Sequence, residues 1–447
     1  MRSGQPAESR QSADMEIPRG GYSESVQTGY ETTSSCTVFY RLMGRYVKVK
    51  AVQRGKEIMG KWRLRPWVKG SIVLLAAAGI FTLTHLNLSE EEEIAAVPSP
   101  SETPLPSAEP EVYTADIFMT GDCLIHGAVY ADARQADGSY DFHLMLENLK
   151  TWTDDYDLCY YNQESILGGT KLGLSSYPMF NSPQEVGDAM TDNGFNLVSL
   201  ANNHSLDRGV SGIESSMKYW NSKEQVVHAG TNLSEEERDS IPVYEVNGIS
   251  YCFLSWTYGC NGLVPPADMP YLVNIYPGHE EEMLEQVRAA DAKADLVIVA
   301  MHWGVEYTLE PVQEVKDLAE KLAAAGADLI IGNHPHVIEP VEYLGDTLCF
   351  YSFGNLIAAQ LDTEDRIGMI GGVTVTKTVQ PDGETEVSLS DARADLTFIC
   401  YDSNIRNFKV VLMRDLDDSQ LPNHAEIYEK YQKVLTQYDG RIRVGMK

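Results

Sequence analysis

Three apolar runs that stop abruptly at polar residues decide the fold: FNLVSLANNH (195–204), DLVIVAMHWG (295–304) and DLIIGNHPH (328–336). Each run has the length of a buried strand and is shorter than a typical helix. Amphipathic helical patterns accompany these runs, as in PQEVGDAMTDNG (183–194) and VQEVKDLAEKLAAAG (312–326). Short apolar strands that alternate with helices predict an α/β fold with a largely parallel sheet.

Further strands and helices extend this pattern along the chain. The additional strands that we expect are ADIFMTGDC (115–123), YDLCYYNQE (156–164), VVHAGT (226–231), YCFLSWT (251–257) and TLCFYSFGN (347–355). The additional helices are GVSGIESSMKYWN (209–221), EEMLEQVRAADAK (281–293) and a terminal helix, AEIYEKYQKVLTQY (425–438). Residues 367–400 are typical of late β-strands that complete a sheet.

The N-terminal part has a different composition. Residues 1–67 are polar and basic, and we expect a cytoplasmic, largely disordered segment. Residues 68–88 form an apolar stretch with basic residues before it and acidic residues after it. This asymmetry predicts an uncleaved transmembrane signal anchor in the cell membrane, with a single span and an extracellular C-terminal part. A cleaved signal peptide is the alternative. An acidic, Pro-rich linker (89–112) then leads to the α/β domain (113–410) and a helical extension (411–447).

Charge and cysteine content restrict the function. The net charge is -30; residues 1–69 hold 13 Lys and Arg against 6 Asp and Glu, which leaves 22 against 59 in the rest. Such an acidic domain repels phosphate backbones, so we expect no nucleic-acid partner. The seven cysteines form no CxxC pair, and four of them lie in apolar runs. We therefore expect small buried side chains rather than a disulfide framework.

Metal-binding side chains gather at the predicted strand ends. In α/β sheets, ligands bind where the carboxyl ends of the strands meet, and carboxylate, amide and imidazole groups suit divalent metals. The residues concerned are Asp122, Glu164, Asn203, His302, His334 and His336. On an extended segment, His334 and His336 would lie on one face. Taken alone, Asp122 is as typical of a turn or helix cap.

A second set of residues suits catalysis or substrate contact. His204 can donate a proton to a leaving atom, and Asp207 can orient its ring. His126, Asn202, Arg208 and Trp303 lie next to the metal-binding candidates in the sequence and are candidates for substrate contact, although His126 can equally be a ligand or a loop residue. Further candidates for substrate walls are Ser175 to Tyr177 and the loop from Tyr258 to Pro266.

Four motifs carry a resemblance to a known family. ANNHSLDRG (201–209), HWGVEY (302–307), GADLIIGNHPHVIEPVEYLGD (326–346) and YSFGNLI (351–357) resemble bacterial capsule synthesis proteins of the CapA/PgsA type, linked to poly-γ-glutamate. The resemblance covers about residues 113–365. It implies a calcineurin-like metallophosphoesterase domain: a four-layer α/β/β/α sandwich that holds two divalent metals (Mn, Zn or Fe).

The resemblance also implies roles for individual residues. Asp122 and His336 would hold one metal, and Glu164 would bridge the two metals. The second metal would be held by Asn203, His302 and His334, with His204 as the catalytic acid. The chain departs from the superfamily at Asp122, because Cys123 and Leu124 follow it in place of the usual Asp-x-His pattern, and His126 could substitute.

Two functions follow from these observations. The first is a surface hydrolase that uses metal to cleave a phosphoester or an amide bond. The second is a non-catalytic accessory subunit that anchors or exports an anionic capsular polymer. The implied partners are that polymer or its precursor and a membrane synthesis or export complex. Because the domain is acidic, an anionic partner needs local cations, for which Lys171, Arg208 and Arg366 are candidates.

Overall fold

The computed structural model describes residues 37–42, 45–50 and 109–446, which belong to two units, Met1–Ser101 and Glu102–Lys447. In the first unit, β1 (Thr37–Leu42) and β2 (Arg45–Lys50) form an antiparallel pair, within a segment for which we expected little regular structure. The predicted membrane span, 68–88, lies outside the described residues. Within the described part of the chain, no helix has both the length and the apolar character needed to cross a bilayer.

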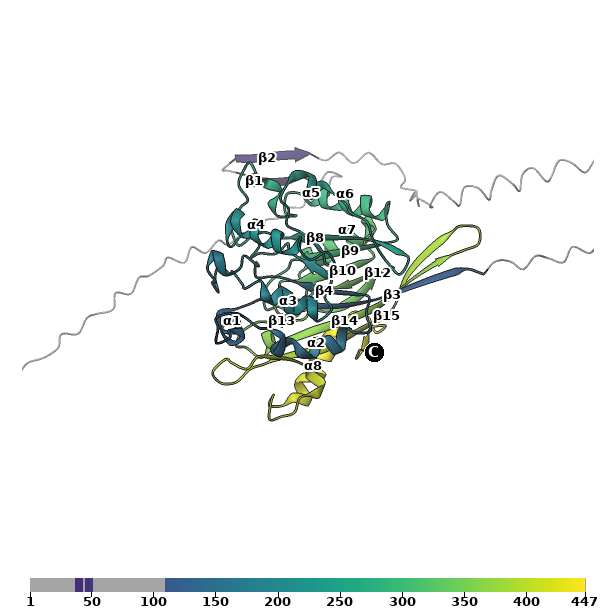
Figure 1. Cartoon of the computed structure of the whole chain (residues 1–447). Helices are drawn as coiled ribbons and strands as arrows, with labels where there is room; N and C mark the ends of the chain where they lie inside the picture. The colour runs from purple at the N-terminus through teal and green to yellow at the C-terminus, as the bar shows by residue number, and fades with distance from the viewer. Residues whose placement is uncertain (1–36, 43–44, 51–108, 447) are drawn as a thin grey trace, which may run out of the picture. The chain divides into compact units, whose positions relative to one another are not determined.

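The second unit contains a nine-stranded sheet in which the first strand of the domain is central. Its order is β16-β15-β14-β3-β4-β5-β6, with β13 paired to β3 and β17 paired to β15 (Figure 1). The strands β3 to β6 are parallel, whereas β14, β15 and β16 are antiparallel. The bounds are β3 (Glu111–Cys123), β4 (Leu158–Asn162), β5 (Leu197–Ser199), β6 (Val227–Ala229), β13 (Asn355–Ile357), β14 (Ile367–Val379), β15 (Thr385–Cys400), β16 (Lys409–Leu412) and β17 (Arg443–Val444).

A second, six-stranded sheet has the order β11-β12-β10-β9-β8-β7. Its centre, β8 to β9 to β10 to β12, is parallel, and antiparallel strands close both edges. The bounds are β7 (Tyr244–Val246), β8 (Ile249–Thr257), β9 (Leu296–His302), β10 (Leu329–Asn333), β11 (Val341–Leu344) and β12 (Thr347–Phe350). The predicted alternation of parallel strands and helices, with late β-strands that complete a sheet, is confirmed.

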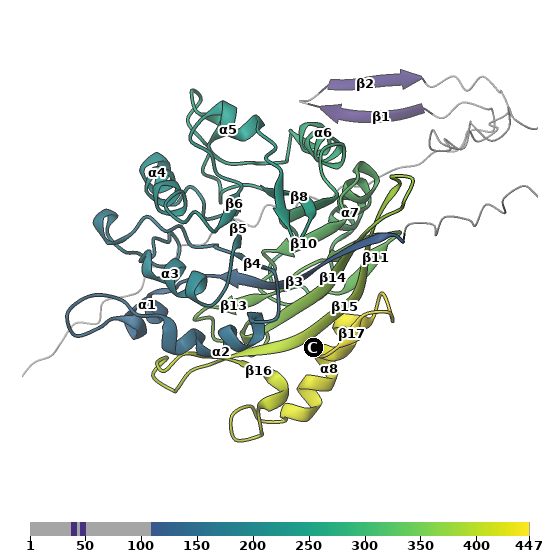
Figure 2. The same cartoon turned by 45° about the vertical axis from the view of Figure 1, so that its right-hand side comes forward.

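Helices cover the outer faces of both sheets, as the two views show (Figures 1 and 2). The first four, α1 (Gly127–Ala133), α2 (His143–Thr153), α3 (Glu185–Asp192) and α4 (Gly209–Trp220), pack on the nine-stranded sheet. The pair α6 (Glu280–Asp291) and α7 (Gln313–Ala325) packs on the six-stranded sheet. A short α5 (Glu235–Asp239) and a C-terminal α8 (His424–Thr436) complete the unit.

The alternation of side chains along β3 explains the layers. Ile117 and Met119 point into a core that both sheets share, whereas Phe118 points into the core under α2 and α3. Successive residues of a strand face opposite sides of the sheet, so an uninterrupted apolar run can fill two cores at once. The result is a helix–sheet–sheet–helix sandwich with three apolar cores.

The C-terminal residues are part of this unit. The expected boundary at residue 410 falls inside β16, and the predicted terminal helix is α8. The buried Asp395 of β15 holds the C-terminal residues against the sheet. It accepts a hydrogen bond from Tyr428 Oη (2.9 Å) and forms an ion pair with Arg414 (2.9 Å). The six cysteines of the described residues are all free thiols, and all but Cys400 are buried. The prediction of buried thiols is therefore confirmed for the four cysteines in apolar runs, and Cys260 is buried as well.

Candidate metal centre

The polar strand ends of the two sheets meet in one buried cluster. Asp122 lies near the end of β3, Glu164 lies two residues beyond β4, and His302 is the last residue of β9. His334 and His336 follow β10. All five side chains are buried. The fold thus brings together residues that are more than two hundred positions apart in the sequence.

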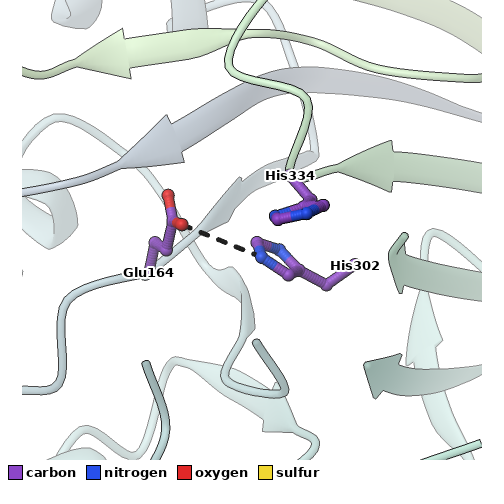
Figure 3. A group of neighbouring side chains, drawn as sticks. All are labelled: Glu164, His302 and His334. Carbon is purple, nitrogen blue, oxygen red and sulfur yellow. Dashed lines mark ion pairs between the residues drawn. The ribbon is translucent and has the colours of Figure 1, made fainter. Parts of the chain in front are cut away.

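These five residues form two groups that share one carboxylate. Glu164, His302 and His334 offer ligand atoms that all lie within 4.8 Å of one another. Their side chains point toward a common centre, with Glu164 Oε1 3.7 Å from His302 Nε2 (Figure 3). Asp122, Glu164 and His336 form the second group within the same limit. In it, His336 Nδ1 lies 3.5 Å from Asp122 Oδ2, and His336 Nε2 lies 3.8 Å from Glu164 Oε1.

The Glu164 carboxylate shows that the cluster fits a cation. The side chain is fully buried, and neither of its oxygens has a hydrogen-bond partner among the described residues. Burial raises the pKa of this carboxyl well above its usual range. A buried and unpaired carboxylate is costly, so such groups pair with a charge or coordinate a metal. The imidazole nitrogens around Glu164 are too distant to be hydrogen-bonded to it, and this spacing suits ligands around an ion.

The imidazoles of the two groups differ in charge. Burial lowers the pKa of His302 well below its usual value and lowers that of His334 to about 3. Both rings are therefore neutral, which is the form that binds metals. Burial also lowers the pKa of His336, but Glu164 and Asp122 raise it, to about 10. The His336 ring therefore carries an additional proton and a positive charge. A cation bound beside these carboxylates would replace that proton.

The two histidines of the HPH motif reach different groups because the chain bends there. His334 has φ 104° and His336 has φ 60°, so the segment is not extended and our expectation of a strand-like arrangement was wrong. Non-glycine residues seldom adopt positive φ, and such strained positions cluster at functional sites. The bend also aims the backbone N–H of His334 at Asp122 Oδ2, 3.2 Å away.

The ANNH motif (201–204) supplies the wall next to the first group. Asn203 Oδ1 lies 3.1 Å from His302 Nε2, so this amide oxygen is placed with the three residues of that group. His204 Nδ1 lies 2.7 Å from Asp207 Oδ2, and the ring of Phe180 packs edge-on against the His204 ring at 4.6 Å. Asp207 and Phe180 therefore hold the His204 imidazole in one orientation.

Two of the four predicted substrate contacts, Asn202 and Trp303, are buried and have hydrogen-bond partners within the protein. Asn202 is buried, and its amide donates to the backbone carbonyl of Gln163 (3.0 Å) and accepts from His204 N (3.0 Å). Trp303 is fully buried in the core under α7, where its indole N–H donates to the carbonyl of Tyr351 (2.9 Å). Trp303 directly follows His302, the last residue of β9, and adjacent residues of an extended chain face opposite sides, so its side chain enters the core.

His126 and Arg208 have different surroundings. His126 is half-buried and packs edge-on against Phe180 at 5.1 Å, so it lies on the same wall as His204. Burial lowers its pKa to about 4, so the ring is neutral. It belongs to neither group of potential metal-binding residues. The Arg208 guanidinium donates to the carbonyl of Leu172 and so braces the loop that follows β4.

Several residues of the cluster were not predicted from the sequence. The amide of Asn162 donates to Asp122 Oδ1 at 2.8 Å and lies 3.3 Å from His302 Nδ1, so it touches both groups. Asn355 Oδ1 lies 3.1 Å from His336 Nδ1. Both residues end apolar runs, in YYNQE and YSFGN, and that signal could have identified them. The ring of Tyr307 lies 6.1 Å from that of His336, and no pattern in the sequence predicts this contact between the two rings.

A family model described as a bacterial capsule synthesis protein matches residues 116–360. The chain belongs to this family. The matched segment contains every member of both groups and ends close to the limit that the sequence motifs had predicted. The resemblance that the sequence motifs carried is therefore confirmed.

Two curated proteins are similar to the chain. The PGA biosynthesis protein CapA of Bacillus subtilis (strain 168) is 34% identical over 179 residues, which are 40% of this chain and 46% of that protein. The capsule biosynthesis protein CapA of Bacillus anthracis is 32% identical over 186 residues, which are 40% of this chain and 44% of that protein. The matches thus span less than half the length of either relative.

Among solved structures, TT1561 of Thermus thermophilus is matched over 62% of this chain and 98% of its own, with 8% identity and a TM-score of 0.32. This score is low, so the fold described above rests on the strand order and packing of this chain alone.

Proposed function

We propose that this chain is a metal-dependent hydrolase of the metallophosphoesterase type that acts in capsule or poly-γ-glutamate biosynthesis. It would cleave a phosphoester or an amide bond of an anionic capsular polymer or its precursor. The observation that carries the proposal is the Glu164 carboxylate, which is fully buried, has no hydrogen-bond partner among the described residues, and is shared by both groups. The family supports the setting in capsule synthesis.

In this proposal the two groups each hold one divalent cation, Mn, Zn or Fe. Asp122, Glu164 and His336 would hold one, while Glu164, Asn203, His302 and His334 would hold the other. The mixture of carboxylate, amide and imidazole ligands suits these metals. Bound metals would activate a water molecule and polarise the scissile group.

His204 is the proton donor in this proposal. Asp207 accepts from its Nδ1 atom, which leaves Nε2 as the nitrogen that can serve the leaving group. The pair is buried, so its orientation is protected from competition by water. The edge-on contact with Phe180 limits rotation of the ring. His126, on the other side of Phe180, completes the wall that a substrate would meet.

The setting of the enzyme is also a proposal. We propose a single-pass anchor at residues 68–88 and an extracellular catalytic domain, because the charge asymmetry of the sequence favours that topology. A membrane complex for synthesis or export would then be the partner. The test is cell fractionation with protease protection of intact cells. Protease accessibility of the domain in intact cells, with the chain in the membrane fraction, is the expected result.

Metal analysis of the purified chain, followed by assays on phosphoesters and γ-glutamyl amides, tests the enzyme itself. We expect bound Mn or Zn in a stoichiometric amount and turnover of at least one substrate class. Absence of bound metal after reconstitution, together with no turnover, would refute the hydrolase and leave the accessory role in anchoring or export of the polymer.

A further inference from the structure

Exposed apolar side chains occur on loops that begin at the strand ends of the metal centre. They lie on four loops that follow the carboxyl ends of β4, β8, β9 and β13. The most exposed are Val264 (80%), Tyr177 (77%) and Leu361 (67%). We call these residues the apolar rim, together with Leu263, Val305 and Tyr307. Exposed apolar groups that gather at one place mark binding surfaces.

The loops of the apolar rim are fastened to the residues of the centre. Tyr307 packs near the ring of His336 at 6.1 Å, and its hydroxyl accepts a hydrogen bond from Gln360 (3.1 Å), next to Leu361. Gln360 in turn accepts from Asn355 (2.6 Å), which touches His336. Two of the four loops are therefore joined to each other directly beside the second group.

The other two loops border the first group. Tyr258, which begins the loop of Leu263 and Val264, packs against the ring of His334 at 4.6 Å. Phe180, three residues after Tyr177, packs against the ring of His204 at the same distance. All four loops therefore begin beside the centre, and we call the side of the centre on which they lie its entrance. The apolar rim is thus part of the entrance and not a remote surface.

The charged groups of the entrance argue against a polyanionic substrate chain. Glu306 and Asp362 are exposed on the same loops as the apolar rim, and Asp365 is buried on the loop of Asp362. Of the three predicted local cations, Arg208 is turned to the carbonyl of Leu172 and Arg366 to that of Ile399, whereas Lys171 is exposed on the loop that follows β4. An anionic polymer that lay across this entrance would meet like charges and apolar groups.

We propose that the group to be hydrolysed reaches the centre on an apolar carrier: the substrate is a phosphoester of an alkyl-like chain, and the apolar rim binds that chain. This inference rests on the proposed hydrolase and defines its substrate class. The phosphate enters the centre, and the adjoining apolar carbons cover Val264, Leu361 and their neighbours. The membrane-bound precursor of a polymer fits this chemistry better than the finished polymer.

Calorimetry with two stable phosphonates tests the proposal on the full-length, metal-loaded chain. Octylphosphonate and methylphosphonate offer the same head group and differ only in the apolar chain. We expect octylphosphonate to bind at least about tenfold tighter, which corresponds to partial burial of its methylene groups. Val264→Ser and Leu361→Ser should each reduce that preference about threefold or more, and leave methylphosphonate binding and metal content unchanged.

Leu144→Ser is the matched control, because Leu144 is equally exposed (76%) but belongs to α2. Equal affinity for the two phosphonates in a metal-loaded chain would overturn the apolar carrier and leave the metal centre intact. An equal effect of the Leu144 substitution would overturn the role of the apolar rim. Rim variants that lose binding to phosphatidylcholine vesicles without any change in octyl preference would instead identify a membrane contact and overturn the proposal. A chain that binds no metal fails at the proposed function itself.

Discussion

Asp207 Oδ2 lies 2.7 Å from His204 Nδ1, and the same oxygen accepts a hydrogen bond from the backbone N–H of Phe180 at 2.5 Å. One carboxylate therefore fixes both the histidine and the aromatic ring that packs against it. The three residues come from two segments of the chain, and their arrangement depends on the loop after β4 returning to α4. This relationship gives the first of four predictions.

His204→Ala should reduce turnover by at least about two orders of magnitude, in the range that general acid catalysis contributes. The metal content should stay near that of the wild-type chain, because His204 is a member of neither group of potential metal-binding residues. Steady-state kinetics and metal analysis on the same sample provide the measurement. Loss of metal in this variant would instead identify His204 as a ligand.

Glu164→Gln should sharply reduce binding of metal at both groups, because the two groups share this carboxylate. The substitution keeps the shape of the side chain and removes its charge. Without metal, the variant should unfold at a temperature close to that of the wild-type chain, because the substitution removes a buried carboxylate that has no hydrogen-bond partner but also removes the negative charge beside His336. Thermal melts with and without a chelator measure this, with the exposed Glu147→Gln as control. Retention of one metal would show that Glu164 is not shared.

Asn162→Ala should weaken metal binding about 10- to 100-fold, which is typical when a residue that orients the ligands is lost. The reason is that its amide contacts Asp122 in one group and His302 in the other. Titration calorimetry with Mn should show weaker binding at both sites together. Asn193→Ala, which removes another buried amide that donates to the carbonyl of Ala189, is the control. Equal effects of the two substitutions would reduce Asn162 to a packing role.

Glu339 should make stability depend on pH. Burial raises the pKa of its carboxyl to about 8, with Glu310 adding to the shift and Lys316 opposing it. The unfolded chain releases this proton near pH 4.3, so the folded chain holds more protons between about pH 4 and 8. Stability contributed by protonated Glu339 is therefore present below that range and lost as pH rises through it, by a few kcal/mol at most.

Urea denaturation at pH 5 and pH 9 measures this effect. The wild-type chain should lose more stability over the interval than Glu339→Gln, whereas the exposed Glu224→Gln should behave like the wild type. Identical pH dependence of the wild-type chain and Glu339→Gln would show that Glu339 is not protonated in the folded state.

The local pattern of the sequence was sufficient for the elements and for most of the cluster. Apolar runs that end near Asp122, Asn203, His302 or His334 predict that these residues lie at strand ends. Because the carboxyl ends of parallel strands meet at one edge of a sheet, the residues were expected to lie close together. The motifs from residue 201 onward also carried the family resemblance that the comparison confirmed. The roles of these residues as ligands and catalysts remain predictions.

Other features depended on contacts between distant segments. Period-two alternation sends Trp303 into the core while its neighbour His302 faces the other sheet, and the sequence alone does not say which side is the site. Asn162 touches both groups only because β3, β4 and β9 end together.

The sequence by itself determined the strands, the helices and the supply of metal-binding groups at the strand ends, because hydrophobic periodicity is a local property of the chain. Only the tertiary structure decided which of these side chains belong to each of the two metal-binding groups. The positive φ values of His334 and His336 turn two neighbouring rings toward different partners. Glu164 can serve both because packing of two sheets brings their carboxyl ends together around it. That convergence arises from the burial of three cores, which no single segment specifies.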